Sequence, residues 1–180
     1  NDGELLVKGD HIMKGYYNNP EATSKDIIDN WFHTGDVGEI DNNGFVSITG
    51  RKKEIYVSSA GKNIAPLVIE ETMKSIPLVS QCFLVGDNKN YCTALITLDV
   101  GVILRDKFSM DSNKIPKDPG EQLKVLISKG KKLDDFTSSD EIFAEIEIKI
   151  NELNNEFSNP EQIKKFTILP RDFTIDDGEL

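Results

Sequence analysis

The chain has 180 residues, of which 38% are hydrophobic and 29% are charged, and its formal net charge is −10. The apolar share is that of a folded protein and excludes a disordered chain, in which apolar residues are depleted. The acidic balance argues against nucleic acid as a partner, because binding of a phosphate backbone requires clustered Lys and Arg.

The first fifty residues are expected to form short strands and turns with one short helix. Leu5–Val7 is an apolar triplet typical of a strand, and Pro20 opens a segment that predicts a helix through Ile28. Within residues 36–49, apolar and polar residues alternate on both sides of an Asp-Asn-Asn-Gly turn at 41–44. This pattern predicts a β-hairpin.

The rest of the chain mixes helices with a second hairpin. A helix is predicted over residues 66–76, and a hairpin pairs residues 79–85 with 91–98. Leu123, Leu126 and Ile127 share a helical face, which predicts one short helix there, and residues 117–120 are typical of a loop. The longest helix is expected to begin near Ser138, since apolar residues recur at 142, 146, 150, 153 and 157.

A last strand is predicted at Phe166–Leu169, before Pro170. The hairpins and helices do not alternate as in a βαβ repeat. We therefore expect an α+β fold, with a small β-rich subdomain followed by an α+β domain whose small antiparallel sheets are flanked by helices.

The two cysteines, Cys82 and Cys92, are too few for a disulfide framework and lack the spacing of a zinc site. We expect both to be small buried residues, in a protein of a reducing, cytoplasmic compartment. No apolar run approaches the roughly 18–20 residues of a membrane-spanning helix. Contact with a membrane surface through parts outside this chain stays open.

Two segments could bind a nucleotide. Asp36 follows Thr34 and Gly35 at the mouth of a strand, where a carboxylate can accept hydrogen bonds from the vicinal hydroxyls of a ribose. Arg51, Lys52 and Lys53 follow the next strand, and the planar fork of Arg51 suits a phosphate. Taken alone, the first segment is more often a plain turn and the second more often a solvated surface.

The segment Ser58–Asn63 is a turn of small residues that would let a ligand approach the backbone, although a plain hairpin turn explains it equally well. His33 and His11 lack a nearby nucleophile or acid pair in the sequence, so we expect both to be structural. No metal site is expected within this chain.

The order and spacing of several motifs resemble the adenylate-forming superfamily, which includes acyl-CoA synthetases, luciferases and the adenylation domains of peptide synthetases. These motifs are GYYNNPEAT at 15–23, WFHTGD at 31–36, GRKKEI at 50–55 and GKNIAP at 61–66. Residues 83–87 and 172–180 are most similar to long-chain fatty acyl-CoA synthetases of the bubblegum type.

The resemblance implies a reaction in two steps. ATP, accompanied by Mg²⁺, and a fatty acid give an acyl-adenylate and pyrophosphate, and the thiol of CoA then displaces AMP. Residues 1–50 would be the end of a large amino-terminal adenylation domain, and residues 51–180 would be a mobile carboxyl-terminal domain.

The resemblance also assigns roles to residues. Asp36 would hold the ribose hydroxyls of ATP or AMP, Arg51 would contact ribose or phosphate oxygens, and Lys53 would be the hinge of the mobile domain. Ala60, Gly61 and Lys62 would approach CoA, although Ala60 stands where many relatives have glycine.

The resemblance further implies that catalytic parts lie outside this chain. The phosphate-binding loop and the fatty-acid tunnel would precede Asn1, and the adenylation lysine would follow Leu180, so the fragment alone is expected to be inactive. Two alternatives remain: a stand-alone nucleotide-binding or interaction module without catalysis, and an adenylating relative with an acceptor other than CoA. Acyl chain length and oligomeric state are not predicted.

Overall fold

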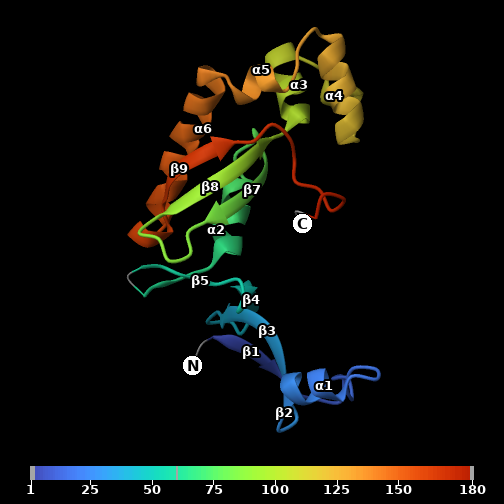
Figure 1. The fold of residues 1–180 in the computed structure, drawn as a ribbon, viewed down its shortest axis with the longest axis vertical. Coiled ribbons are helices and arrows are strands. Elements are labelled where there is room, and N and C mark those ends of the chain that lie inside the picture. Colours follow the sequence, from blue (N-terminus) through green and yellow to red (C-terminus); the bar gives the residue numbers. More distant parts are fainter. Residues whose placement is uncertain (1–2, 60, 179–180) are drawn as a thin grey trace. The chain divides into compact units, whose positions relative to one another are not determined.

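The structure is a computed structural model that describes residues 3–59 and 61–178. Contacts divide these residues into two compact units. The first runs to Ile55 and includes Ala65–Val68, whereas the second comprises Tyr56–Ile64 and the chain from Ile69 onward. Both units combine helix and strand (Figure 1), which confirms the expected α+β class. The identity of residues 1–50 as the end of a larger domain stays a prediction.

The first unit is built on a four-stranded sheet. Its elements are β1 (Glu4–Val7), α1 (Pro20–Asp26), β2 (Ile27–Ile28), β3 (Trp31–Ile40) and β4 (Val46–Arg51). The long strand β3 pairs antiparallel with each of the other three. The helix predicted through Ile28 ends at Asp26, because Ile27 and Ile28 pair with Phe32 and Trp31 in the sheet.

The predicted hairpin of β3 and β4 is confirmed, and its turn is fixed by Asp41. One carboxylate oxygen of Asp41 accepts from the backbone N–H of Asn43 at 2.9 Å and of Phe45 at 2.8 Å. These hydrogen bonds, led by that from Phe45, lower the pKa of the Asp41 carboxyl. At the bulge in β3, a Cβ on Gly38 would lie 2.5 Å from the carbonyl oxygen of Ser47, so only glycine fits.

Two sheets make up the strand content of the second unit. Strands β5 (Tyr56–Val57) and β6 (Asn63–Ile64) form a short hairpin, and β7 (Val79–Val85), β8 (Cys92–Leu98) and β9 (Ile163–Ile168) form a three-stranded sheet with β8 in the middle (Figure 1). The predicted β7–β8 hairpin is confirmed. The pairing of β8 with β9 is parallel, which the expectation of antiparallel sheets did not include.

The remaining helices are α2 (Pro66–Met73), α3 (Val100–Phe108), α4 (Pro119–Ser128), α5 (Asp134–Thr137) and α6 (Asp140–Leu153), with 3-10 turns at Ser112–Lys114, Asn154–Glu156 and Asn159–Glu161. Helix α4 begins inside the segment predicted as a loop, since Asp118 caps it by accepting from the N–H of Glu121 at 2.9 Å. Helix α3, which the sequence patterns did not predict, is capped by Asp99 in the same way.

Helix α6 is the longest helix of the described residues, as predicted, but it ends at Leu153 rather than near Phe157. The reason is Asn154, whose buried side chain bonds both ways to the backbone of Ile163 in β9. Its Nδ2 donates to the Ile163 carbonyl at 2.8 Å, and its Oδ1 accepts from the Ile163 N–H at 2.9 Å. These two hydrogen bonds hold the end of helix α6 against strand β9.

The hydrophobic core lies in the second unit, where α3, α4 and α6 contribute apolar residues to the same cluster as β7 and β8. Cys82 and Cys92 belong to this core as free thiols, which confirms their expected burial. Burial raises the pKa of Cys82 to about 12 and that of Cys92 to about 11. Among the described residues, no helix has the length and apolarity needed to cross a membrane.

Candidate functional site

Asp36 and Arg51, which the sequence singled out separately, are cross-strand partners on β3 and β4. The Nε of Arg51 lies 2.8 Å from the Oδ1 of Asp36. The Asp36 side chain is 22% exposed and that of Arg51 is 62% exposed, so the carboxylate is fixed at the sheet while the guanidinium extends to solvent. The structure therefore brings together an acceptor for hydroxyls and a planar donor for phosphate oxygens.

A cleft of about 610 Å³ opens beside this pair, within the first unit. Its lining includes Glu4, Asp26, His33, Arg51, Lys52 and Lys53. The volume lies within the roughly 300–1,000 Å³ that is usual for small-molecule sites. A cleft that combines carboxylates with three consecutive cations can bind a ligand that carries both hydroxyls and phosphates.

Glu4 is the centre of the polar contacts in this cleft. Its carboxylate accepts from Nζ of Lys52 at 2.9 Å and from the Gly35 N–H at 3.2 Å, and it lies 3.4 Å from Nδ1 of His33. The hydrogen bond from Lys52 is the main reason that the pKa of Glu4 lies below its usual value. The side chain thus joins β1 to β3 and to the turn after β4.

The backbone around Asp36 is held by its neighbours. The hydroxyl of Thr34 donates to the Leu5 carbonyl at 2.9 Å and accepts from the Asp36 N–H at 3.0 Å. Gly35 has a φ of +73°, and its carbonyl accepts from the Lys52 N–H at 2.8 Å. These bonds set the position of Asp36 before any ligand binds.

Lys53 lies in the turn that follows β4 and lines the cleft. Arg51 is paired with Asp36, and Lys52 is paired with Glu4. Among the ion pairs of the described residues, none involves Lys53. Its ammonium therefore offers a positive charge that no carboxylate of residues 3–59 and 61–178 neutralises, and this charge favours an anionic ligand. The predicted hinge role of Lys53 stays a prediction.

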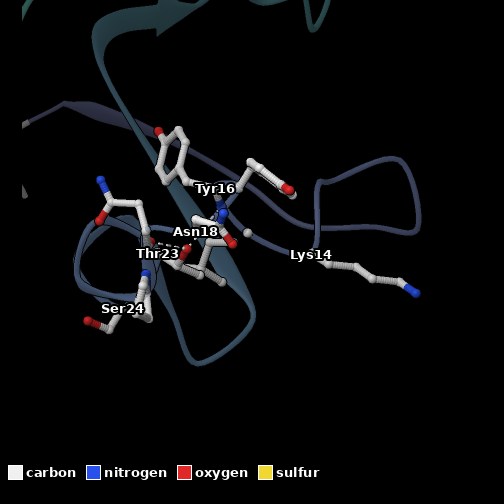
Figure 2. A pocket seen from close by; sticks show the side chains of 10 residues that line it. Lys14, Tyr16, Asn18, Thr23 and Ser24 are labelled. Carbon is white, nitrogen blue, oxygen red and sulfur yellow. Dashed lines mark hydrogen bonds between the residues drawn. The ribbon is translucent and has the colours of Figure 1, made fainter.

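A second hollow of about 590 Å³ lies beside the loop before α1, and Figure 2 shows Tyr16, Asn18 and Thr23 around it. The Tyr16 N–H donates to the Thr23 hydroxyl at 2.9 Å, and the Tyr16 hydroxyl donates to Asp26 at 3.0 Å. The bond to Asp26 raises the pKa of the Tyr16 phenol. Tyr16 also lines the cleft beside Arg51, so it is shared by the two hollows.

Gly61 and Lys62, predicted to approach CoA, lie in the second unit, in the turn of the β5–β6 hairpin. The Gly61 N–H donates to the Ser58 carbonyl at 2.8 Å, and a Cβ on Gly61 would meet nothing within 4 Å. Its φ of +77° is the reason that glycine is favoured here. Ala60 lies outside the described residues.

Glu4 and Tyr16 were not among the predicted site residues, and Lys52 was predicted only as part of the basic segment after the strand. Glu4 is nearly fifty residues from Lys52 along the chain, so no local spacing connects them. His33 was expected to be structural, and it does line the cleft beside Glu4. His11 does not line this cleft, and the described residues contain no cluster of three His, Cys, Asp or Glu that could hold a metal ion.

Comparison with known sequences identifies related proteins. Residues 53–112 match the family model of the AMP-binding enzyme C-terminal domain. The Long-chain-fatty-acid–CoA ligase FadD15 of Mycobacterium tuberculosis is 41% identical over 179 residues, which cover 99% of this chain and 27% of the relative. The Long-chain-fatty-acid–CoA ligase ACSBG2 of Gallus gallus is 34% identical over 183 residues, which cover 99% of this chain and 24% of the relative.

Solved structures share the fold. The adenylation domain of a carboxylate reductase from Mycobacterium chelonae has a TM-score of 0.68 at 20% identity, covering 98% of this chain and 24% of that one. The o-succinylbenzoate CoA synthetase of Bacillus subtilis in complex with an acyl-adenylate intermediate has a TM-score of 0.61 at 22% identity, covering 98% and 28%. These structural matches show that the fold is shared, whereas the family-model match and the sequence relatives confirm the resemblance to adenylate-forming enzymes. The chain spans about a quarter of the length of the curated relatives it matches.

Proposed function

We propose that this chain, a relative of adenylate-forming long-chain-fatty-acid–CoA ligases, is part of an enzyme that joins a long-chain fatty acid to CoA at the expense of ATP. In the first step the fatty-acid carboxylate attacks the α-phosphorus of ATP, which forms an acyl-adenylate and releases pyrophosphate. In the second step the CoA thiol attacks the acyl carbonyl, and AMP leaves. The observation that carries this proposal is the ion pair between Asp36 and Arg51, of which Arg51 lines the cleft.

The pair divides the recognition of the nucleotide between two groups. The Asp36 carboxylate accepts hydrogen bonds from the two ribose hydroxyls, and Arg51 donates to ribose or phosphate oxygens. Charged acceptors give stronger hydrogen bonds than neutral ones, and a group held in advance loses little entropy on binding. The bonds of Thr34 and Gly35 to neighbouring strands supply that advance positioning.

Lys53 would serve as the hinge between the two steps. The boundary between the two units falls between Ile55 and Tyr56, close to Lys53, and this supports a hinge in that part of the chain. A movable domain is useful here because the first step requires exclusion of water from a reactive anhydride, whereas the second step must admit a bulky thiol.

The turn of the β5–β6 hairpin would face CoA in the second step. Gly61 is open above its Cα, so a ligand can approach the backbone at that residue. Mg²⁺ enters with ATP as part of the substrate, and no residue of this chain is assigned to hold it. We place the protein in the cytoplasm and propose that the 180-residue chain alone does not adenylate.

The test is product analysis with the native protein that contains this chain. Incubation with palmitate, ATP, Mg²⁺ and CoA should yield palmitoyl-CoA, AMP and pyrophosphate in equal amounts. AMP release without palmitoyl-CoA would favour an adenylating relative with another acceptor. Nucleotide binding without any turnover would favour a binding or interaction module, and ADP with inorganic phosphate would refute an AMP-forming ligase.

A further inference from the structure

The turn between β5 and β6 is held on one side by the loop between β7 and β8. The Ser59 N–H donates to the Lys89 carbonyl at 3.0 Å, and the Ser59 hydroxyl donates to the side-chain oxygen of Asn90. The neighbouring Asn88 N–H donates to the Val57 carbonyl at 2.9 Å. This side of the turn is therefore tied to the three-stranded sheet by backbone as well as side-chain bonds.

The other side of the turn is held through Lys62. Its Nζ donates to the hydroxyl of Ser158 and lies 3.3 Å from Oε2 of Glu161. Glu161 is 99 residues further along the chain, in the 3-10 turn Asn159–Glu161 that leads into β9. Lys62 thus connects the β5–β6 turn to the 3-10 turn before β9, which lies far along the chain but in the same unit.

The carboxylate of Glu161 is held in position by Ser158, so it can pair with the Lys62 ammonium. Its carboxylate accepts from both the N–H and the hydroxyl of Ser158, the former at 3.0 Å, in a capping box. Burial raises the pKa of Glu161, but the hydrogen bonds from Ser158 and the ammonium of Lys62 outweigh it, so the net shift is downward. The Glu161 side chain is 26% exposed and the Lys62 side chain is 44% exposed, so the pair is screened only in part.

The pairing changes the role that Lys62 can have. A lysine that reaches into solvent would act on CoA as a free charge toward its phosphates. Here a carboxylate already neutralises the ammonium, and a phosphate would have to displace it. The side chain of Lys62 instead fixes the end of the turn, and its N–H reinforces this by donating to the Ser58 hydroxyl at 3.0 Å.

We propose that Glu161 is a positioning residue for the CoA step: by holding Lys62 it fixes Gly61 and Lys62, on one side of the hairpin turn, in the position that receives CoA. This inference rests on the proposed function, because it takes the turn as the surface that faces CoA. It concerns the thioester-forming step and not the formation of the acyl-adenylate, in which CoA takes no part.

The test is a double-mutant cycle in the native protein that contains this chain. Glu161→Ala, Lys62→Ala and the double variant are compared for the KM of CoA in acyl-CoA formation and for fatty-acid-dependent ATP–pyrophosphate exchange. We expect each single variant to raise the KM of CoA by about 2- to 5-fold, as loss of a partly exposed ion pair implies, and the double variant to be no worse than either. Exchange should change by less than about 2-fold in all three.

Two further variants sharpen the result. The charge-exchanged double variant Lys62→Glu with Glu161→Lys should recover part of the lost CoA affinity, which a direct contact of Lys62 with phosphate would not allow. Glu152→Ala is the matched control, because it removes an exposed Lys149–Glu152 pair of 2.8 Å on α6 in the same unit. It should leave the KM of CoA unchanged.

An unchanged or lowered KM of CoA in Glu161→Ala would overturn the inference, since freeing Lys62 would then leave CoA binding intact or improve it. Additive effects of the two single variants would also overturn it. Failure of the proposed function itself looks different, because the unmutated native protein would then form no acyl-CoA at all.

Discussion

Replacement of Asp36 by alanine is the sharpest test of the proposed binding of the nucleotide ribose by Asp36. The change removes the acceptor for the ribose hydroxyls and leaves Arg51 without its partner at 2.8 Å. A hydrogen bond to a charged group contributes about 1.5–3 kcal/mol, so loss of one such bond corresponds to a rise of roughly 10- to 150-fold in the KM of ATP. The loss of stability should be far smaller, because Arg51 is 62% exposed and an exposed ion pair contributes about 0.2–1 kcal/mol.

The two effects are separated by two assays on the native protein that contains this chain. ATP–pyrophosphate exchange with a saturating fatty acid gives the KM of ATP, and urea unfolding gives the free energy of unfolding. Asp106→Ala is the matched control, since it removes an exposed Arg105–Asp106 pair of 2.6 Å on α3. An unchanged KM of ATP in Asp36→Ala, or an equal rise in Asp106→Ala, would refute the assignment.

Three further predictions concern the hinge and the sheet. Lys53→Pro should slow thioester formation more than it raises the KM of ATP, because it restricts the backbone where the domain rotates; separate half-reaction rates measure this. Gly38→Ala should lower the free energy of unfolding by about 1–3 kcal/mol, since its Cβ would lie 2.5 Å from the Ser47 carbonyl oxygen; urea unfolding measures this. Glu4→Gln should make the free energy of unfolding depend less steeply on pH in the acid range. The pKa of Glu4 is lowered by Lys52, so its contribution is present above the ordinary value of 4.5 and is lost as the pH falls through the folded value.

Each of these predictions has a contrary outcome. Equal loss in both half-reactions of Lys53→Pro would point to general misfolding rather than a blocked hinge. Wild-type stability of Gly38→Ala would mean that the bulge in β3 can shift. An acid limb of unchanged slope in Glu4→Gln would show that other carboxylates control stability at low pH.

Local patterns predicted the parts of the fold that depend on neighbours in sequence. The β3–β4 hairpin was predicted because the Asp41 turn carries its own hydrogen bonds, and the long helix α6 because apolar residues recur on one face. The parallel pairing of Cys92 with Ile163 could not be predicted in this way, since no local signal joins strands so far apart. Helix α3 carries a weak local signal because its start, Val100-Gly101-Val102, combines residues of low helix propensity, and only the Asp99 cap marks where it begins.

The same distinction applies to the candidate site. Asp36 and Arg51 were predicted from motifs, and their direct contact follows from the register of β3 and β4. The contacts of Glu4 with Lys52 and of Lys62 with Glu161 connect distant segments, so only the folded chain reveals them. Polar contacts of this kind have no period in the sequence, whereas apolar faces do.

Fatty-acid-dependent ATP–pyrophosphate exchange, measured in parallel on the native protein and on the purified 180-residue chain, is the most direct test of the central claim. We predict exchange by the native protein, its loss of ATP affinity in Asp36→Ala, and no exchange by the chain alone. Absence of exchange in the native protein, or exchange by the 180-residue chain, would contradict the account.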